Sequence, residues 1–583
     1  MKKLTIDTEC YPNFFSVQFK NHESGKMLIF VKTEDQTPDL KLVKRLMDGA
    51  LTIGFNSMRY DIPMVIGLLQ GWDNNQLKKL SNDIIHNDLS PYQTFTKYAF
   101  PQYAWNHIDI KDPAPGVMVS LKTYGGRLHA KKLQDLPYDP DQILTQDQIQ
   151  EVIKYCENDL DTTWLLYEDI LHEIELREEM GKVYNTDLRS KGGAQIAKFV
   201  FVNSLGTKYL KTPPIEIHYK APEWIKFHKL DWVLKLVEEQ VYSLKSSGHV
   251  ELPEVITKVI SFDGAKYKLG LGGLHSQEKK QSIICKDDEE LQDIDVVSYY
   301  PSLILNLGLY PRHYGDKFLS VYRKYYNERI QAKETGDKIT ANSLKLVLNS
   351  SFGLFGNKYS PLYSPDLMIA VTLTGQLALL MLIERLALNG IKTKSANTDG
   401  ILIHYPKNKS HFVKAIVGKW EKDTGLTMET TDYRSIHMAS VNGYIAIKKD
   451  GKVKPKGPYA EVGISKNPSM YVCVKAATRH ILTGEPIDQI IKSETSIKDF
   501  LAVRNVAGGA VWKDQYLGKV VRFYWSTDGD KITYKKNGNK VPLSDSTTPL
   551  MELPDEMPDN IDYDRYIEES YSMLNDLGVI TKS

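Results

Sequence analysis

The stretch KSANTDGILIHY, residues 394–405, constrains the fold more than any other part of this sequence. Two β-prone runs meet at Thr398, Asp399 and Gly400, and an Asp-Gly pair between apolar residues predicts a β-hairpin. The hairpin carries one carboxylate at its tip. A single acid at a hairpin tip raises the question of where in the chain a partner acid would come from.

The bulk properties of the chain are those of a globular protein with several domains. Its 583 residues are several times what one hydrophobic core serves, so we expect three to five packed units. A composition of 42% hydrophobic and 25% charged residues excludes a disordered or fibrous chain. The formal net charge is +1, so any site for a polyanion must be local.

Cysteine usage and hydropathy indicate a cytosolic protein without a membrane span. Cys10, Cys156, Cys285 and Cys473 lie far apart with no CxxC pair, which argues against zinc or iron-sulfur sites and predicts free thiols. The N-terminus lacks an apolar core long enough for a signal peptide. The most apolar stretch, residues 369–388, is interrupted by polar and charged side chains, which predicts a buried helix.

Acidic residues recur in three segments of the first 170 residues. In LTIDTEC (4–10), a predicted strand, Asp7 and Glu9 share one face because side chains alternate. GFNSMRYDIPMV (54–65) predicts a strand-to-helix turn that carries Asn56, Tyr60 and Asp61. The segment 146–170 reads as an amphipathic helix on which Tyr155 and Asp159 lie four residues apart, on one face.

These four acids are candidate ligands for a pair of divalent metal ions. Asp7, Glu9, Asp61 and Asp159 could hold two ions about 3.5–4 Å apart, which suits in-line attack on a phosphodiester. Tyr155 would then orient the attacking water. The alternative interpretation is a set of surface acids beside an ordinary helix.

The partner for the hairpin acid is predicted in LQDIDVVSYYPSLILNLGLYP, residues 291–311. This segment runs from an apolar strand through a turn into a helix, and Asp295 stands at the end of the strand. A nucleotidyl transferase with two Mg²⁺ ions needs two fixed carboxylates, which Asp295 and Asp399 would supply.

A predicted helix at residues 338–359 places cations, amides and an aromatic ring on one stripe. On that stripe Lys345 would neutralise a triphosphate and Asn349 would hydrogen-bond near the sugar. Phe352 with Gly353 would leave a flat surface for a base pair. The alternative is a surface helix with a solvated basic face.

Together these motifs resemble two sets of conserved sequences in the family B DNA polymerases. The DxxSxYPS pattern at Asp295, the KxxxNSSFG pattern at Lys345 and Thr398-Asp399 resemble motifs A, B and C. The order DxE, NxxxYD and YxxxD in the first 170 residues resembles the three exonuclease motifs of proofreading polymerases. The resemblance implies a multi-domain α/β and α+β chain, with an RNase H-like exonuclease followed by a right-hand polymerase.

The resemblance also implies a division of the chain and a set of site residues. The expected parts are an exonuclease domain (1–175), a linker and palm-entry region (176–285), palm (286–315 and 363–440), fingers (316–362), and thumb with C-terminal cap (441–583). The metal ligands would be Asp295, the Val296 carbonyl, Asp399 and the four N-terminal acids. Residues expected to bind dNTP, primer or template are Ser298, Tyr300, Arg323, Lys345, Asn349, Phe352, Gly353, Asn56, Gly272, Gly273 and Tyr444.

Two of these roles follow from the resemblance in more detail. Tyr300 would be a steric gate whose ring lies under the sugar, so that a 2′-hydroxyl clashes. Arg323 would be a second phosphate clamp, with a solvated arginine as the alternative.

The chain departs from the family pattern at four positions. Asn397 replaces the first acid of the usual Asp-Thr-Asp, which puts metal affinity in doubt. Phe352 replaces a tyrosine. Gly270 stands where a YxGG element has its tyrosine, and Asn442 occupies the lysine position of a KxY element. Near it, five lysines between 448 and 456 predict a local phosphate-binding patch.

The implied function is template-directed DNA synthesis with proofreading, using two Mg²⁺ ions per site, which Mn²⁺ can replace. Only 49 residues separate Asp295 from Lys345, too few for the inserted domain of protein-primed polymerases, so we expect an ordinary primer. The compact arrangement resembles tailed-phage polymerases. We therefore expect a monomer in the host bacterial cytoplasm that binds primer-template DNA and dNTPs, with phage helicase, primase and single-strand-binding protein as partners. The alternatives are an exonuclease with an impaired palm and a non-catalytic DNA-binding protein.

Overall fold

The computed structural model describes residues 2–116 and 118–580, which form two compact α/β units. Unit 1 contains the described residues up to Gly192, together with Val462–His480 and Gly484–Glu569. Unit 2 contains Gly193–Glu461, Ile481–Thr483 and the described residues from Ser570 onward. Residues 462–569, expected to belong to a separate thumb and cap, therefore group largely with the N-terminal residues.

Unit 1 is built on a five-stranded sheet in the order β3-β2-β1-β4-β5. Strands β1 to β3 are antiparallel, and β4 and β5 run parallel to β1. The strands are β1 (Lys3–Tyr11), β2 (Phe14–Asn21), β3 (Lys26–Lys32), β4 (Leu51–Gly54) and β5 (His107–Asp109). The helices around it are α1 (Leu40–Gly49), α2 (Asp61–Leu69), α3 (Asn74–Ile85), α4 (Pro91–Lys97), α5 (Leu121–Arg127), α6 (Gln146–Asp169) and α7 (Leu171–Tyr184).

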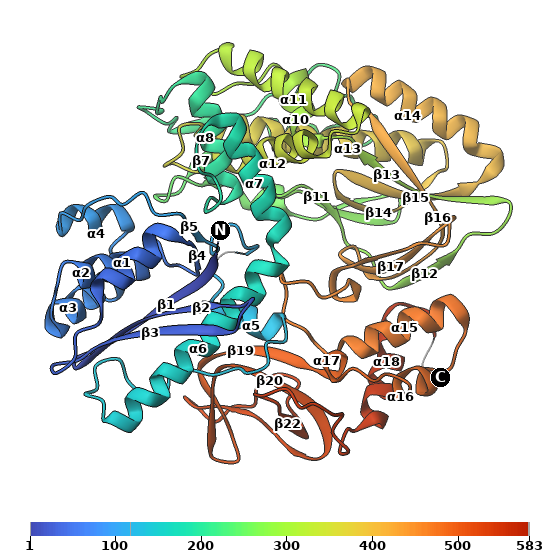
Figure 1. The fold of residues 1–583 in the computed structure, drawn as a ribbon. Coiled ribbons are helices and arrows are strands. Elements are labelled where there is room, and N and C mark those ends of the chain that lie inside the picture. The colour runs from blue at the N-terminus through green and yellow to red at the C-terminus, as the bar shows by residue number, and fades with distance from the viewer. Residues whose placement is uncertain (1, 117, 581–583) are drawn as a thin grey trace. The chain divides into compact units, whose positions relative to one another are not determined.

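The alternation of side chains along β1 separates a core face from an acidic face. Leu4, Ile6 and Cys10 are buried in one hydrophobic cluster with residues of α1, α2 and α3, which lie beside the sheet in Figure 1. Asp7 and Glu9 alternate with them and are only partly buried. The prediction that these two acids share a face of a strand is confirmed, as is the helix at 146–170, whose start carries a capping box.

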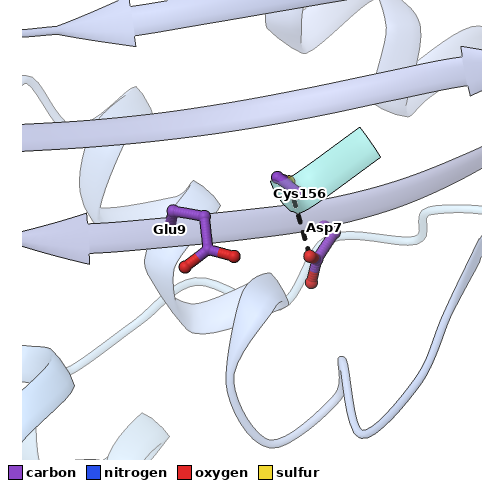
Figure 2. Close-up of side chains that lie close together, drawn as sticks. All are labelled: Asp7, Glu9 and Cys156. Atoms are coloured by element: carbon purple, nitrogen blue, oxygen red, sulfur yellow. Dashed lines mark hydrogen bonds between the residues drawn. The ribbon is translucent and has the colours of Figure 1, made fainter. Parts of the chain in front are cut away.

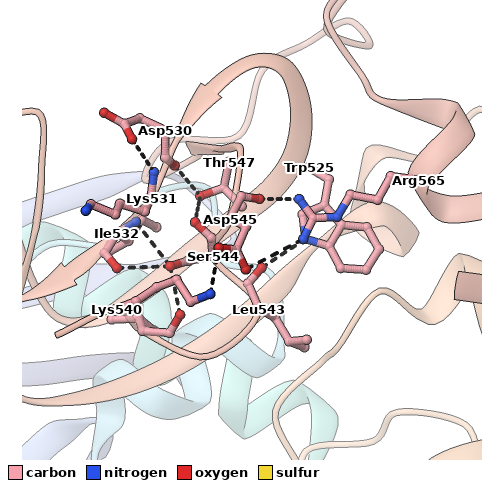
Figure 3. Close-up of polar contacts among 11 residues, drawn as sticks. Trp525, Asp530, Lys531, Ile532, Lys540, Leu543, Ser544, Asp545, Thr547 and Arg565 are labelled. Carbon is pink, nitrogen blue, oxygen red and sulfur yellow. Dashed lines mark hydrogen bonds and ion pairs between the residues drawn. The ribbon is translucent and has the colours of Figure 1, made fainter.

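A second sheet of unit 1 has the strand order β21-β19-β20-β22. Its strands are β19 (Ala502–Trp512), β20 (Gln515–Asp530), β21 (Thr533–Tyr534) and β22 (Thr547–Pro549), and the short helices α16 (Ile487–Lys492) and α17 (Ile497–Phe500) precede them. Figure 3 shows how side chains hold the long loop before β22. Ser544 Oγ donates to the Ile532 carbonyl at 2.9 Å, and Trp525 Nε1 donates to the Leu543 carbonyl at 2.9 Å. These bonds satisfy backbone groups that no strand pairs.

Unit 2 is dominated by a ten-stranded sheet. The path is β18-β17-β16-β13-β15-β14-β11-β10-β9, and β12 also pairs with β16. These strands are β9 (Ile260–Phe262), β10 (Ala265–Lys268), β11 (Leu274–Ser276), β12 (Gln281–Ile284), β13 (Glu289–Val296), β14 (Lys392–Thr398), β15 (Gly400–Pro406), β16 (Met428–Ser440), β17 (Gly443–Lys448) and β18 (Val453–Lys456). The predicted hairpin is confirmed as β14 and β15, with Asn397 opposite Gly400.

Helices and a small sheet complete unit 2. The helices are α8 (Gly193–Leu205), α9 (Asp231–Glu238), α10 (Tyr299–Asn306), α11 (Lys317–Thr335), α12 (Lys338–Phe355), α13 (Pro365–Leu388) and α14 (Ser410–Thr424), with 3₁₀ turns at Glu254–Thr257, Lys407–Lys409 and Gly457–Tyr459. Strands β6 (Glu216–His218), β7 (Val241–Leu244) and β8 (Val250–Glu251) form the small sheet. Helices α15 (Tyr471–Thr483) and α18 (Tyr563–Asp576) have residues in both units.

Two further predictions from composition are confirmed. Helix α13 is long and apolar enough to cross a membrane, but most of it is buried inside the protein, as expected of a core helix. All four cysteines are free thiols.

Candidate active sites

The first candidate site lies in unit 1, where the four predicted acids come together. Asp7 and Glu9 leave the acidic face of β1, Asp61 begins α2 and Asp159 lies on α6. Thr8 Oγ1 donates to Asp61 Oδ1 at 2.6 Å, which fixes the start of α2 against β1. Electrostatic interaction couples Asp7 to Asp61, Glu9 and Asp159. Segments more than 150 residues apart in the chain thus supply one acidic cluster.

Burial gives this cluster unusual proton affinity. Loss of hydration raises the pKa values of Asp7 and Glu9 well above their ordinary range, and the neighbouring carboxylates raise them further. Burial also raises the pKa of Asp61 to about 7. Lys122 supplies a positive charge beside Asp159 and Glu9, but it only partly offsets the carboxylates, which outnumber it. Buried carboxylates in excess favour a bound cation, and an all-oxygen set suits Mg²⁺ or Mn²⁺. The four acids therefore fit the metal ions that the sequence analysis expects.

Two further side chains enter this cluster that the sequence analysis did not single out. Cys156 Sγ donates to Asp7 Oδ2 at 3.4 Å, as Figure 2 shows. Lys122, on α5, pairs with Asp159 and lies 4.1 Å from the centroid of the Tyr155 ring. Lys122 thus joins the predicted acid to the predicted water-orienting tyrosine. Cys156 follows Tyr155 on a helix already expected to be amphipathic, whereas no local pattern marks Lys122.

Asn56, which the resemblance places among the residues that bind dNTP, primer or template, lies in the turn between β4 and α2. It adopts a left-handed backbone with φ of 59°. Together with Asp7 and Asp61 it lines a cavity of about 360 Å³, to which Phe55 and Tyr60 contribute aromatic side chains. An aromatic, partly apolar cavity beside an acidic cluster has the character of a nucleotide subsite.

The second candidate site lies in unit 2, at the end of β13 and the tip of the β14–β15 hairpin. Asp295 is paired in register with Gly400, the residue that follows Asp399. The Val296 N–H donates to the Asp399 carbonyl at 2.8 Å. Both acids line one pocket of about 160 Å³. The structure therefore brings together two carboxylates that are separated by about a hundred residues in the chain.

Gly400 allows the Asp295 carboxylate to lie where it does. A Cβ atom at position 400 would be 1.9 Å from Asp295 Oδ1, closer than any non-bonded contact. The Asp295 side chain thus lies over the bare backbone of Gly400, beside the acid at the hairpin tip. The glycine of the Asp-Gly pair consequently has a role beyond the turn for which the sequence analysis selected it.

The charges around these two acids nearly balance. Burial, with Asp293 next in effect, raises the pKa of Asp295 to about 6, and burial also raises the pKa of Asp399. Lys454 and Lys456 line the same pocket from β18. Lys454 Nζ lies 2.9 Å from Asp293 Oδ2, and Tyr433 donates to the same oxygen at 2.7 Å. The lysine patch predicted at 448–456 thus reaches the acids through two of its members.

A pair of aromatic rings lies near Asp399, whose charge acts on Tyr300. The Tyr300 and Phe352 rings are stacked, with centroids 4.0 Å apart and planes 1° from parallel. The Tyr300 hydroxyl donates to the Gly272 carbonyl at 3.2 Å. Gly273 has φ of 131°, and a Cβ there would lie 2.9 Å from the Thr398 Cα. The two glycines carried over by the resemblance therefore contact the predicted gate and the hairpin tip.

The remaining predicted substrate residues occupy different surroundings. Lys345, Asn349 and Gly353 are exposed on α12, and Tyr444 is buried in the wall of the pocket. Arg323 is exposed on α11, whereas Arg329, six positions later, donates to Ser298 Oγ at 2.6 Å. Ser298 has a left-handed backbone with φ of 50° at the start of α10. Arg329 is thus the α11 arginine next to the Asp295 turn, and the sequence analysis did not select it.

Comparisons with known proteins give limited similarity. No protein-family model matches the chain. A segment of 123 residues is 28% identical to DNA polymerase 1 of Saccharolobus solfataricus and covers 20% of this chain and 14% of that protein. A segment of 148 residues is 22% identical to DNA polymerase 1 of Sulfurisphaera ohwakuensis and covers 24% of this chain and 16% of that protein. The matched segments thus span about a sixth of these relatives.

A solved structure is also similar over the length of the chain. It is the family B DNA polymerase from the hyperthermophilic archaeon Pyrobaculum calidifontis, with a TM-score of 0.42 and 12% sequence identity. The similarity covers 100% of this chain and 78% of that one.

Proposed function

We propose that this chain is a DNA polymerase of family B that extends a nucleic-acid primer on a DNA template and proofreads with a 3′→5′ exonuclease. The observation that carries the proposal is that Asp295 and Asp399 line one pocket. Asp295 is paired with Gly400 on the neighbouring strand, and Asp399 directly precedes that glycine. The sequence similarity to two archaeal polymerases supports the same conclusion.

At the polymerase site, Asp295 and Asp399, with the Val296 carbonyl, would hold two Mg²⁺ ions. When bound, such ions stabilise the charge that develops as a primer 3′-hydroxyl displaces pyrophosphate from a dNTP. Lys345 and Asn349 on α12 would bind the triphosphate and sugar, and Tyr300 would exclude a 2′-hydroxyl. Ser298 at the start of α10, and Arg329, which donates to its hydroxyl, would contact the same triphosphate.

At the exonuclease site, Asp7, Glu9, Asp61 and Asp159 would hold a second pair of Mg²⁺ or Mn²⁺ ions. Tyr155 would orient a water for attack on the terminal phosphodiester, and Lys122 fixes the ring by lying over it. Asn56 would bind the single strand. The products would be a 5′-nucleotide and a strand shortened by one residue.

We propose further that the protein is a monomer that replicates a phage genome in the cytoplasm of a bacterial host. The spacing of 49 residues between Asp295 and Lys345 supports an ordinary primer rather than a terminal protein. Its partners would be primer-template DNA and dNTPs, with phage helicase, primase and single-strand-binding protein at the fork.

Primer extension on a primed template tests the polymerase. We expect Asp295→Ala and Asp399→Ala each to lower the rate at least about 100-fold, because each removes a charged ligand from a buried site. Wild-type protein that fails to extend any primer would favour the alternative in which the Asn397 site only binds DNA. In that case the exonuclease alone would remain active.

Degradation of single-stranded DNA in the presence of Mg²⁺ tests the exonuclease. Loss of this activity in Asp7→Ala, with primer extension retained, would assign it to the acidic cluster. The third alternative, a DNA-binding protein without catalysis, requires that wild type shows neither activity while it still binds DNA.

A further inference from the structure

One buried carboxylate organises the turn that carries Asn56. Asp109 ends β5 and is 8% exposed. Its Oδ1 accepts the N–H of Asn56 at 2.9 Å and that of Lys111 at 3.0 Å, and its Oδ2 accepts the N–H of Met58 at 2.9 Å. Two of these charge-assisted hydrogen bonds hold the backbone where Asn56 takes its left-handed conformation, and the third joins Asp109 to the backbone of Lys111.

The side chain of Asn56 is oriented by a lysine. Lys111 Nζ donates to Asn56 Oδ1 at 2.7 Å. An ammonium group has only donors, so the amide oxygen must face Lys111 and the amide NH₂ group must point elsewhere. Within residues 2–116 and 118–580, no carboxylate lies within 4.0 Å of Lys111 Nζ. The contact with Asn56 is therefore not a by-product of a salt bridge.

The amide of Asn56 borders the cavity that also touches the acidic cluster. Asp7, Phe55, Asn56 and Asp61 all line this space of about 360 Å³. Asp7, Asp61 and Asp88 line the cavity with carboxylates, which accept hydrogen bonds when ionised and repel phosphate. Arg59 also lines the cavity, and its guanidinium pairs with Asp88. A neutral donor at this wall complements the oxygen atoms of a nucleotide without competing for the metal ions.

We propose that Asp109 and Lys111 are positioning residues of the exonuclease site. Asp109 fixes the turn at residues 56–58, and Lys111 fixes the amide so that Asn56 Nδ2 donates to an oxygen of the 3′-terminal nucleotide of a single DNA strand. Both act through Asn56 and touch no reacting atom. This inference rests on the proposed exonuclease and adds how that site selects and orients a strand end.

The test measures binding and degradation of a single-stranded oligodeoxynucleotide labelled at its 5′ end. Fluorescence anisotropy in EDTA gives the affinity, and single-strand degradation with Mg²⁺ gives KM and kcat. Measurements at about 0.1 M salt or above screen charges more than about 10 Å apart. Lys79→Met, at an exposed site on α3, is the matched control for loss of a positive charge.

Lys111→Met should weaken binding and raise KM about tenfold with a smaller change in kcat, and Lys111→Arg should restore both because it keeps a donor. Asn56→Asp keeps an acceptor oxygen for Lys111 but removes the side-chain NH₂ group. It should therefore weaken binding and raise KM by a similar factor. Since Lys111 acts through Asn56, the double variant Lys111→Met/Asn56→Asp should be no worse than Asn56→Asp alone. Asp109→Asn should lower kcat/KM at least as much as Asn56→Asp does, because it weakens the hydrogen bonds that hold the turn.

Three results would overturn the inference. Multiplicative losses in the double variant would mean that Lys111 contacts DNA directly. Wild-type affinity in Asn56→Asp would mean that the amide does not donate. Equal losses in Lys79→Met would mean that only net charge matters. A wild-type protein that does not degrade the strand would instead overturn the proposed exonuclease, while the binding measurement would still decide whether Lys111 acts through Asn56. A thermal unfolding midpoint within a few degrees of wild type identifies variants that remain folded.

Discussion

Asn397 Nδ2 donates a hydrogen bond to Asn442 Oδ1 at 3.1 Å, and these are two of the positions where the chain departs from the family pattern it resembles. The resemblance expects an acid at the first position and a lysine at the second. An amide pair has no net charge, as an acid and a lysine together would have none. The two departures therefore compensate each other in charge and remain in contact.

This contact predicts coupled effects of substitution. Asn397→Asp removes the donor and adds a carboxylate two residues from Asp399, and Asn442→Lys adds a cation that faces an amide donor. Each should slow primer extension about 3- to 10-fold, the effect of one lost hydrogen bond. The double variant should recover most of the rate, because an ion pair replaces the amide pair. If the loss in the double variant equals the product of the two single losses, residues 397 and 442 are not coupled and the prediction is wrong. Asn389→Asp, at the end of α13, is the control.

The stacked rings of Tyr300 and Phe352 predict where sugar selectivity is set. Tyr300→Ala removes the ring and should let ribonucleotides enter, with discrimination reduced about 10- to 200-fold. Tyr300→Phe loses only the hydrogen bond to the Gly272 carbonyl and should keep discrimination. The measurement is the ratio of kcat/KM for a dNTP and the matching ribonucleotide. Unchanged discrimination in Tyr300→Ala would remove the gate assignment.

The contact between Asp295 and the backbone of Gly400 predicts an unusually sensitive glycine. Gly400→Ala would place a methyl group 1.9 Å from Asp295 Oδ1, so the carboxylate must move. A displacement of about 1 Å in a reacting group lowers rates about 100-fold, and we expect a loss of that size in primer extension. Gly418→Ala on α14, where the added methyl meets nothing within 4 Å beyond its own helix backbone, should leave the rate unchanged. Wild-type extension by Gly400→Ala would show that Asp295 is not fixed there.

Local sequence signals predicted the elements that carry the sites. The Asp-Gly pair gave the β14–β15 hairpin, alternation gave the acidic face of β1, and amphipathic spacing gave α6. The capping box of Thr145 and Gln148 at the start of α6 was also readable in the sequence, although the analysis did not use it. These signals depend on residues within a few positions of each other, so a single sequence contains them.

The contacts that the sequence analysis missed are those made between distant segments of the chain. Lys454 reaches Asp293 because β18 lies at the edge of a sheet in which β13 is an interior strand, and no spacing in the chain predicts that order. Lys122 reaches Asp159 across 37 positions of the sequence, and Lys111 reaches Asn56 across 55. Such contacts arise from strand order and helix packing, which the local pattern of one sequence leaves undetermined.

Asp293 predicts how the polymerase site responds to pH. Burial and the Asp293 carboxylate raise the pKa of Asp295 to about 6, so Asp295 stays protonated up to that pH and cannot ligate a metal ion. Apparent Mg²⁺ affinity in primer extension should therefore rise with pH through about 6 and then level off. Asp293→Asn removes a negative neighbour and frees Lys454 from its partner, and both changes favour the ionised form of Asp295.

The rise in Mg²⁺ affinity should accordingly move to lower pH in Asp293→Asn. Mg²⁺ titrations of primer extension between about pH 5 and 8, for wild type and variant, measure the shift. Asp287→Asn, an exposed acid in the loop before β13, is the control for the loss of one negative charge. A rise that stays in place, or that moves to higher pH, would mean that Asp293 does not set the charge of Asp295. The proximity of these two acids on β13 would then serve only to hold Lys454 and Tyr433.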